Sequence, residues 1–238
     1  MNPLLDFAGL PRFDAIQPSD VQPAISQLLA ESRAEVERLL TNDVPTTWDS
    51  FAQPLQDNLE RLSRAWGIVG HLHSVNDIPP WREAYNAMLP EVTTFYAGLG
   101  QNLALFKRYQ ALAASAEFET LSPARQRIIL NEVRDFKLSG AELPDNDKPR
   151  FQELQERLSQ LAAKFSENLL DATNAFHLDV TNEAELDGLP ADVKAAAKAA
   201  AEKANSAGWR FSLHAPSYLP VMQYASHRPL RAQMYRAY

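Results

Sequence analysis

The chain contains no cysteine among its 238 residues. Disulfide bonds, thiolate metal sites and a cysteine nucleophile are therefore excluded. A lack of cysteine is typical of proteins in a reducing compartment, so we expect a cytoplasmic location. Glycine is also scarce, with eight residues, and no phosphate-binding glycine loop, dinucleotide fingerprint or Gly-x-Ser-x-Gly turn occurs. These absences argue against nucleotide-binding loops and against the hydrolases that use that turn.

Long apolar runs and an excess of positive charge are missing as well. No segment approaches the roughly 20 apolar residues of a membrane-spanning helix, and the first twenty residues lack the basic and apolar regions of a signal peptide. The formal net charge is -7, and the Lys and Arg residues are interleaved with Asp and Glu. Because such a chain repels phosphate backbones, we expect neither nucleic acid nor a membrane as a partner.

Apolar residues repeat every three or four positions over most of the chain, which predicts helices. We expect helices over residues 18–40, 46–72, 102–115, 122–140 and 148–176. A further helix is expected after the break at Pro79 and Pro80, with a kink at Pro90.

Proline, glycine and capping residues mark where these helices begin and end. Ser19, followed three residues later by Gln22, predicts a capping box for the first helix. Pro54 is expected to kink the second helix or to mark its start. The segment from Ser122 through Pro123 to Gly140 has the usual Pro-in, Gly-out asymmetry. The fold class is therefore mainly α, built from antiparallel helical hairpins or a bundle.

The longest predicted helix carries a nearly heptad apolar seam. Its members are Phe151, Leu154, Leu158, Leu161, Phe165 and Leu169. Such a seam can receive a partner helix in a coiled coil, or it can pack within the chain as part of a helical hairpin. We favour the hairpin, because the preceding helices have matching apolar stripes.

The pattern of apolar residues changes near Phe176, from helical periodicity to short alternating segments. Two short alternating segments, "FHLDVT" and "WRFSLH", predict strands, and the alanine-rich segment between them predicts a helix that ends at Gly208. We therefore expect a small two-stranded β ribbon near the C-terminal end, followed by two short helices broken near 227–229. Residues 1–238 are interpreted as one helical region with a change of layer near residue 176.

Five histidines and a few hydroxyl groups are the candidates for chemistry. His71 and His73 are two positions apart, so on a helix their side chains diverge and cannot share a metal. His177 with Asp179, Glu183 and Glu185 could hold a cation, although such an acidic run is more often a solvated turn. Ser217 beside Tyr218 is interpreted as a helix N-cap rather than a nucleophile. We predict no catalytic and no metal-binding residue in the chain.

Several segments, in the same order, resemble the N-terminal part of the thimet oligopeptidase family of zinc metallopeptidases. They include "NPLLDFAGLPRFDAIQPSDVQPAISQLLAESRAEVERLL", "LNEVRDFKLSGAELP", "ELDGLPADVKAAAKAAAEK" and "WRFSLHAPSYLPVMQYASHRPLRAQMYRAY". The resemblance covers essentially the whole chain. It implies a mostly helical enzyme of two halves around a deep channel, which cuts short peptides, including fragments of signal peptides, and does not digest folded proteins.

The same resemblance implies a zinc site on a His-Glu-x-x-His helix, and this chain has no such motif. We therefore expect the N-terminal, channel-wall part of a longer enzyme, inactive alone and without bound zinc. Its expected partners are short peptides and the C-terminal catalytic half of the same polypeptide. The helical pattern of Leu230, Met234 and Tyr238 reaches the last residue without a stop signal, which favours this interpretation.

Two other hypotheses remain open at this point. A free-standing helical protein-interaction module is the main alternative, and the long seam supports it. A small helical metal protein that uses His177 and nearby acids is the third.

Overall fold

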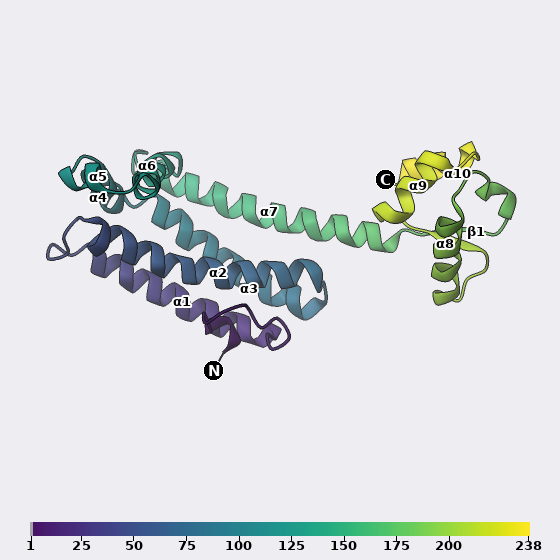
Figure 1. Ribbon diagram of the computed structural model, residues 1–238, viewed down its shortest axis with the longest axis horizontal. Coiled ribbons are helices and arrows are strands. Elements are labelled where there is room, and N and C mark those ends of the chain that lie inside the picture. The colour runs from purple at the N-terminus through teal and green to yellow at the C-terminus, as the bar shows by residue number, and fades with distance from the viewer. Residues whose placement is uncertain (1) are drawn as a thin grey trace. The chain divides into compact units, whose positions relative to one another are not determined.

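The computed structural model of the chain describes residues 2–238 and is helical over most of them (Figure 1). The helices are α1 (Pro18–Leu39), α2 (Gln53–Val75), α3 (Pro79–Gly100), α4 (Leu103–Ala113), α5 (Ala116–Thr120), α6 (Pro123–Leu138), α7 (Lys148–Ala175), α8 (Ala191–Lys203), α9 (Ala215–Tyr224) and α10 (Arg228–Ala237). The strands are β1 (Leu178–Val180) and β2 (Trp209–Phe211). The mainly α class with one small ribbon is confirmed. None of the helices in the described residues combines the length and apolar character that crossing a membrane requires.

The chain divides into two compact units, one ending at Gln160 and the other running from Leu161 to Tyr238. In the first unit, α1, α2 and α3 lie side by side (Figure 1) and bury a shared apolar core. Its fully buried members include Ile25, Leu29, Leu62, Val69 and Met88. Their three- and four-residue spacing along each helix is the pattern from which the helices were predicted.

A second core in the same unit joins the end of α1 to α4 and α6. Phe51, Phe106, Tyr109 and Phe136 form its aromatic centre. Arg108 closes one side, because its guanidinium donates to the carbonyl oxygens of Leu39, the last residue of α1, and of Val44 in the connection that follows. A cation at this position also complements the negative end of the helix dipole.

Several helix ends match the residues that predicted them. Ser122 caps α6 by accepting a hydrogen bond from the Arg125 N–H at 3.4 Å, and Gly140 follows its C-terminus with a φ of +89°. Pro54 lies in the first turn of α2, directly after a π-helical turn over Trp48–Ala52. These predictions are confirmed.

At the start of α1, by contrast, the predicted capping box at Ser19 is wrong. The N-cap is Gln17, and the Asp20 carboxylate accepts its backbone N–H at 2.8 Å. Pro18 occupies the first helical position, because its fixed φ suits a helix and its missing N–H costs nothing there. Ser19 therefore already lies inside the helix. Helix α3 begins at Pro79 as expected and continues through Pro90 as one helix.

The seam of α7 is not a hairpin interface, and that prediction is wrong. No residue of α7 is buried. The helix contacts α3 through polar atoms: Thr94 Oγ1 lies 2.9 Å from Glu156 Oε1, and Thr93 Oγ1 lies 3.2 Å from Ser159 Oγ. Glu156 and Ser159 thus lie on the side of α7 that faces α3. Of the seam residues, Phe151 at the start of α7 is half-buried beside Tyr96 and Ala97 of α3, whereas Leu154, Leu158, Leu161, Phe165 and Leu169 are exposed.

In the second unit, β1 and β2 pair antiparallel with Leu178 opposite Phe211 and Val180 opposite Trp209. The ribbon packs with α8, α9 and α10 around a separate core. The predicted strand pairing and the break before α10 are confirmed. The expected end of α8 at Gly208 is wrong: the helix ends at Lys203, and Gly208, at a φ of +83°, leads into β2 instead.

A half-buried carboxyl group in the first unit makes a pH-dependent contribution to stability. Glu132 on α6 accepts a hydrogen bond from Gln56 Nε2 at 2.8 Å. Burial raises the pKa of Glu132, and nearby Asp135 adds to the rise, while the bond from Gln56 opposes it. The folded state thus holds this proton more tightly than the unfolded state does. This stabilisation is complete at low pH and is lost as the pH rises through the raised pKa.

We expect Glu132→Gln to raise the melting temperature at pH 7–8 by roughly 1–3 °C, because the amide keeps the bond without burying a charge. The gain should shrink toward pH 4, where Glu132 is protonated. Melting curves between pH 4 and 8 measure this. The control is Glu119→Gln, at an exposed residue of the same unit. A variant less stable than the parent at pH 8 would contradict the assignment.

Candidate functional site

The two histidines on α2 pack against aromatic rings. The His71 ring lies 5.4 Å from the ring of Phe13 in an edge-on arrangement, and the His73 ring stacks on Tyr85 at 4.4 Å. The two side chains thus contact different aromatic partners, as expected for residues two positions apart on a helix.

The acidic run after His177 is divided among separate partners. Asp179 accepts two hydrogen bonds from Arg210, both at 2.7 Å. The bonds from the Arg210 guanidinium hold the pKa of Asp179 below its ordinary value. Glu185 instead lies 3.6 Å from His227 Nδ1. Within residues 2–238, no three His, Asp or Glu side chains gather in an arrangement that could hold a metal ion.

Ser217 is not the N-cap of α9, so the N-cap prediction is wrong. Helix α9 begins at Ala215 after the N-cap His214. The Ser217 hydroxyl accepts the backbone N–H of Ser212 at 2.9 Å, which ties the end of β2 to the first turn of α9. His214 Nε2 faces Asn174 Oδ1 at 3.1 Å. The hydroxyl therefore has a structural role.

A cavity of about 310 Å³ lies in the second unit beside α8 and β2. Phe176, Val193, Ala197 and Phe211 give it an apolar lining, and His177 also lines it. A cavity of this size and polarity fits one apolar side chain or a small apolar group.

A groove of about 350 Å³ lies between α1 and α3 in the first unit. Its apolar residues include Val36 and Leu40 from α1, and Phe95 and Leu99 from α3. Arg33 and Glu37 supply charge of both signs, and the Arg33 guanidinium lies 5.8 Å from the Phe95 ring centre. An apolar groove with both charges beside it is chemically suited to a segment that carries apolar side chains and charged groups.

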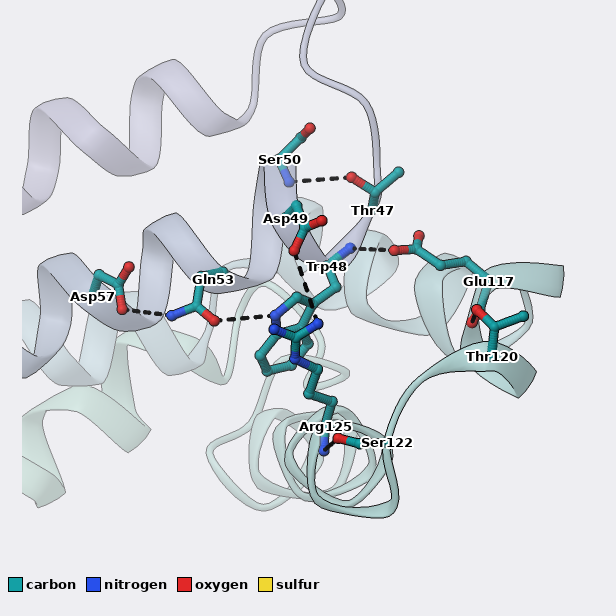
Figure 2. Close-up of polar contacts among 10 residues, drawn as sticks. All are labelled: Thr47, Trp48, Asp49, Ser50, Gln53, Asp57, Glu117, Thr120, Ser122 and Arg125. Carbon is teal, nitrogen blue, oxygen red and sulfur yellow. Dashed lines mark hydrogen bonds and ion pairs between the residues drawn. The ribbon is translucent and has the colours of Figure 1, made fainter.

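A network around Trp48 fixes the connection between α1 and α2 (Figure 2). The Trp48 backbone N–H donates to Glu117 at 3.1 Å, and its indole N–H donates to Gln53 at 3.1 Å. The Arg125 guanidinium lies 5.0 Å from the indole ring. These contacts join the start of α2 to α5 and α6. We interpret the network as support for the bundle rather than as a site.

No pattern in the sequence pointed to the groove residues. Arg33 and Glu37 look like ordinary exposed charges of an amphipathic helix, and their groove neighbours on α3 lie about sixty positions further along the chain. Only the pairing of α1 with α3 brings the two stretches together.

Comparison with known proteins gives a consistent result. The family model described as the neurolysin/thimet oligopeptidase N-terminal domain matches residues 25–148. Oligopeptidase A from Haemophilus influenzae is 44% identical over 237 residues, the protein from Escherichia coli 42% and the one from Salmonella typhimurium 41%. Each alignment covers 100% of this chain and 35% of the relative. The chain therefore spans about a third of the length of the curated relatives it matches.

The family model covers more than half of the chain, and the relatives align along all of it. The chain accordingly belongs to the neurolysin/thimet oligopeptidase family, in the N-terminal region of that family.

Proposed function

We propose that this chain is the N-terminal, channel-wall part of a zinc metallo-oligopeptidase that hydrolyses short peptides, including fragments of signal peptides. The observation that carries the proposal is the 44% identity to an oligopeptidase A along the whole chain. The catalytic half lies in the part of the polypeptide that the relatives have beyond the aligned region. We also propose a cytoplasmic location, which agrees with the absence of cysteine.

The residues of this chain do not fit a zinc site. Two histidines four apart on one helix face grip zinc in this class of peptidase, and no two of the five histidines have that spacing. His73 stacks on Tyr85, and Asp179 is bound by Arg210. In our proposal the metal ligands and the general base belong to the other half, and this chain controls which substrates reach them.

Access control follows from the shape and chemistry of helical walls. A narrow channel lined by packed helices admits a flexible peptide. It excludes a folded domain, because the domain is wider than the channel and would have to unfold to enter. The groove between α1 and α3 supplies an apolar surface beside Arg33 and Glu37. We propose that this groove contacts passing peptides weakly, since tight binding of the substrate alone would not speed its hydrolysis.

The proposal predicts that the 238-residue chain alone hydrolyses no peptide, even with zinc added. A quenched fluorescent peptide of about ten residues measures hydrolysis, and isothermal titration with the same peptide measures binding. We expect binding weaker than micromolar. The matched sample is the longer polypeptide, which should cleave the peptide and lose activity with a metal chelator. Hydrolysis or micromolar binding by the short chain would contradict the proposal.

The alternative function is a free-standing helical protein-interaction module. The uncovered apolar side of α7 favours it. Reading the source DNA past the codon for Tyr238 separates the two. A frame that continues to His-Glu-x-x-His supports the peptidase, and a stop codon supports the module.

A further inference from the structure

Helix α7 carries an uncovered row of large apolar side chains, which we call the α7 stripe. Its members are Leu154, Leu158, Leu161, Phe165 and Leu169, each 48–68% exposed. They follow one another at intervals of three and four positions, so they form one continuous row about 22 Å long. This length is enough to receive three turns or more of another helix.

A helix on the surface of a protein normally buries its apolar side and exposes its polar side. Over most of its length, α7 has the opposite orientation. Beyond Phe151 at its start, α7 contacts α3 through the polar residues Glu156 and Ser159, while the stripe is exposed. Burying apolar area stabilises a protein by about 25 cal/mol per Å², and an exposed row of this size marks an interaction surface. The stripe therefore offers a surface for a partner helix.

The charges beside the stripe indicate what kind of helix covers it. In heptad terms, Leu158 and Phe165 occupy a positions, and the preceding g positions are Arg157 and Lys164. Arg150 lies one heptad earlier and pairs with Glu153 on the same helix at 2.7 Å. The stripe thus has a cationic flank along its central part. Acidic residues on the incoming helix would complement this flank.

A second copy of α7 does not supply that complement. In an antiparallel pair, g positions face g positions, so Arg157 would face Lys164 at the centre, twice by symmetry. Only the outer Arg150 would meet an acid, Asp171. In a parallel pair, Arg157 and Lys164 would face the uncharged Ala162 and Leu169. Self-association therefore leaves the central cations repelled or unmatched.

We infer that the α7 stripe seats a helix from the part of the same polypeptide that the relatives have beyond the aligned third. That helix has an apolar seam and acidic residues opposite Arg157 and Lys164. The inference rests on the proposed function, because the occupant exists only if the polypeptide continues. The relatives leave room for it, since this chain covers 35% of their length.

The absence of cysteine makes a direct test possible. Leu158→Cys places one thiol on the stripe, and Gln160→Cys places a matched thiol two positions away, at an exposed residue on the opposite side of α7. The rate of thiol alkylation at each position is followed by mass spectrometry of the peptide that contains it. Each variant is measured in the 238-residue chain and in the longer polypeptide.

We expect both thiols to react at similar rates in the short chain. In the longer polypeptide, the Leu158→Cys thiol should react at least about tenfold more slowly, with Gln160→Cys unchanged. Adding Arg157→Glu should restore most of the lost reactivity, whereas Arg134→Glu on α6, which pairs with its exposed neighbour Asp135, should not.

Three results would overturn the inference. Equal reactivity of Leu158→Cys in both polypeptides would show that the stripe stays open. Protection that grows with the concentration of the short chain would assign the stripe to a second copy. A reading frame that ends at Tyr238 would remove the occupant. Peptide hydrolysis by the longer polypeptide is scored separately, so a hydrolysing enzyme with a reactive Leu158→Cys would refute the docking while leaving the proposed function intact.

Discussion

Phe51→Ala is expected to lower the free energy of unfolding of the first unit by about 3–5 kcal/mol. Phe51 is 0% exposed. Its ring packs 5.0 Å from the Tyr109 ring, and the Arg108 guanidinium lies 5.1 Å from it on another side. Removing the ring takes away its buried apolar area and leaves a cavity among side chains that Arg108 and Tyr109 hold in place. Urea denaturation followed by circular dichroism measures the loss.

The matched control removes the same atoms from the α7 stripe. Phe165 is 68% exposed, so Phe165→Ala in the 238-residue chain should change the free energy of unfolding by less than about 0.5 kcal/mol. A loss comparable to that of Phe51→Ala would mean that Phe165 is covered in the isolated chain, and the outward orientation of α7 would then be wrong.

Gly208→Ala is expected to destabilise the second unit by about 3 kcal/mol or more. Gly208 has a φ of +83°, which alanine tolerates poorly, and a Cβ built there would lie 2.1 Å from the Val180 carbonyl oxygen. Relieving that contact requires β1 and β2 to move apart. Because the ribbon has only three residue pairs, little remains to hold it once they separate. Hydrogen exchange of the backbone amides in β1 and β2 reports the opening.

Gly9→Ala separates backbone strain from steric contact. Gly9 has a similar φ of +86°, but a Cβ there meets no atom within 4 Å. Only the conformational cost remains, about 1–2 kcal/mol. If Gly9→Ala and Gly208→Ala lost the same free energy of unfolding, the close approach of Gly208 to Val180 would make no contribution to the loss.

Much of this fold could be predicted from local patterns. Helical periodicity, as in Ile25 and Leu29, depends on residues that are close in the sequence. The same is true of helix ends, as at Ser122 with Pro123 and at Gly140. A single sequence therefore contains the information needed to predict them. The ribbon was also predictable, because the alternation in "FHLDVT" and "WRFSLH" differs from its surroundings. The caps at Ser19 and Ser217 were wrong because each serine has a proline directly before it, which begins the helix earlier.

The orientation of α7 could not be predicted in this way. A heptad seam states that Leu158 and Phe165 need a partner, and it does not state whether the partner lies in the same stretch of chain. Polar contacts such as that of Thr94 with Glu156 produce no repeat of apolar residues in the sequence, because they form hydrogen bonds and do not bury apolar area. The groove at Arg33 and Glu37 was unpredictable for a related reason, because it depends on which helices become neighbours.

The boundary between the two compact units falls inside α7, after Gln160. A helix with no buried residue depends mainly on its own hydrogen bonds, and such a segment opens locally at low free energy. Arg157 and Lys164, on either side of that boundary, are both cleavage positions for trypsin-like proteases. We therefore expect the middle of α7 to be the segment of the isolated chain that proteases cleave most readily. In a crude extract, proteolysis at this segment, rather than unfolding of either core, would limit the lifetime of the chain.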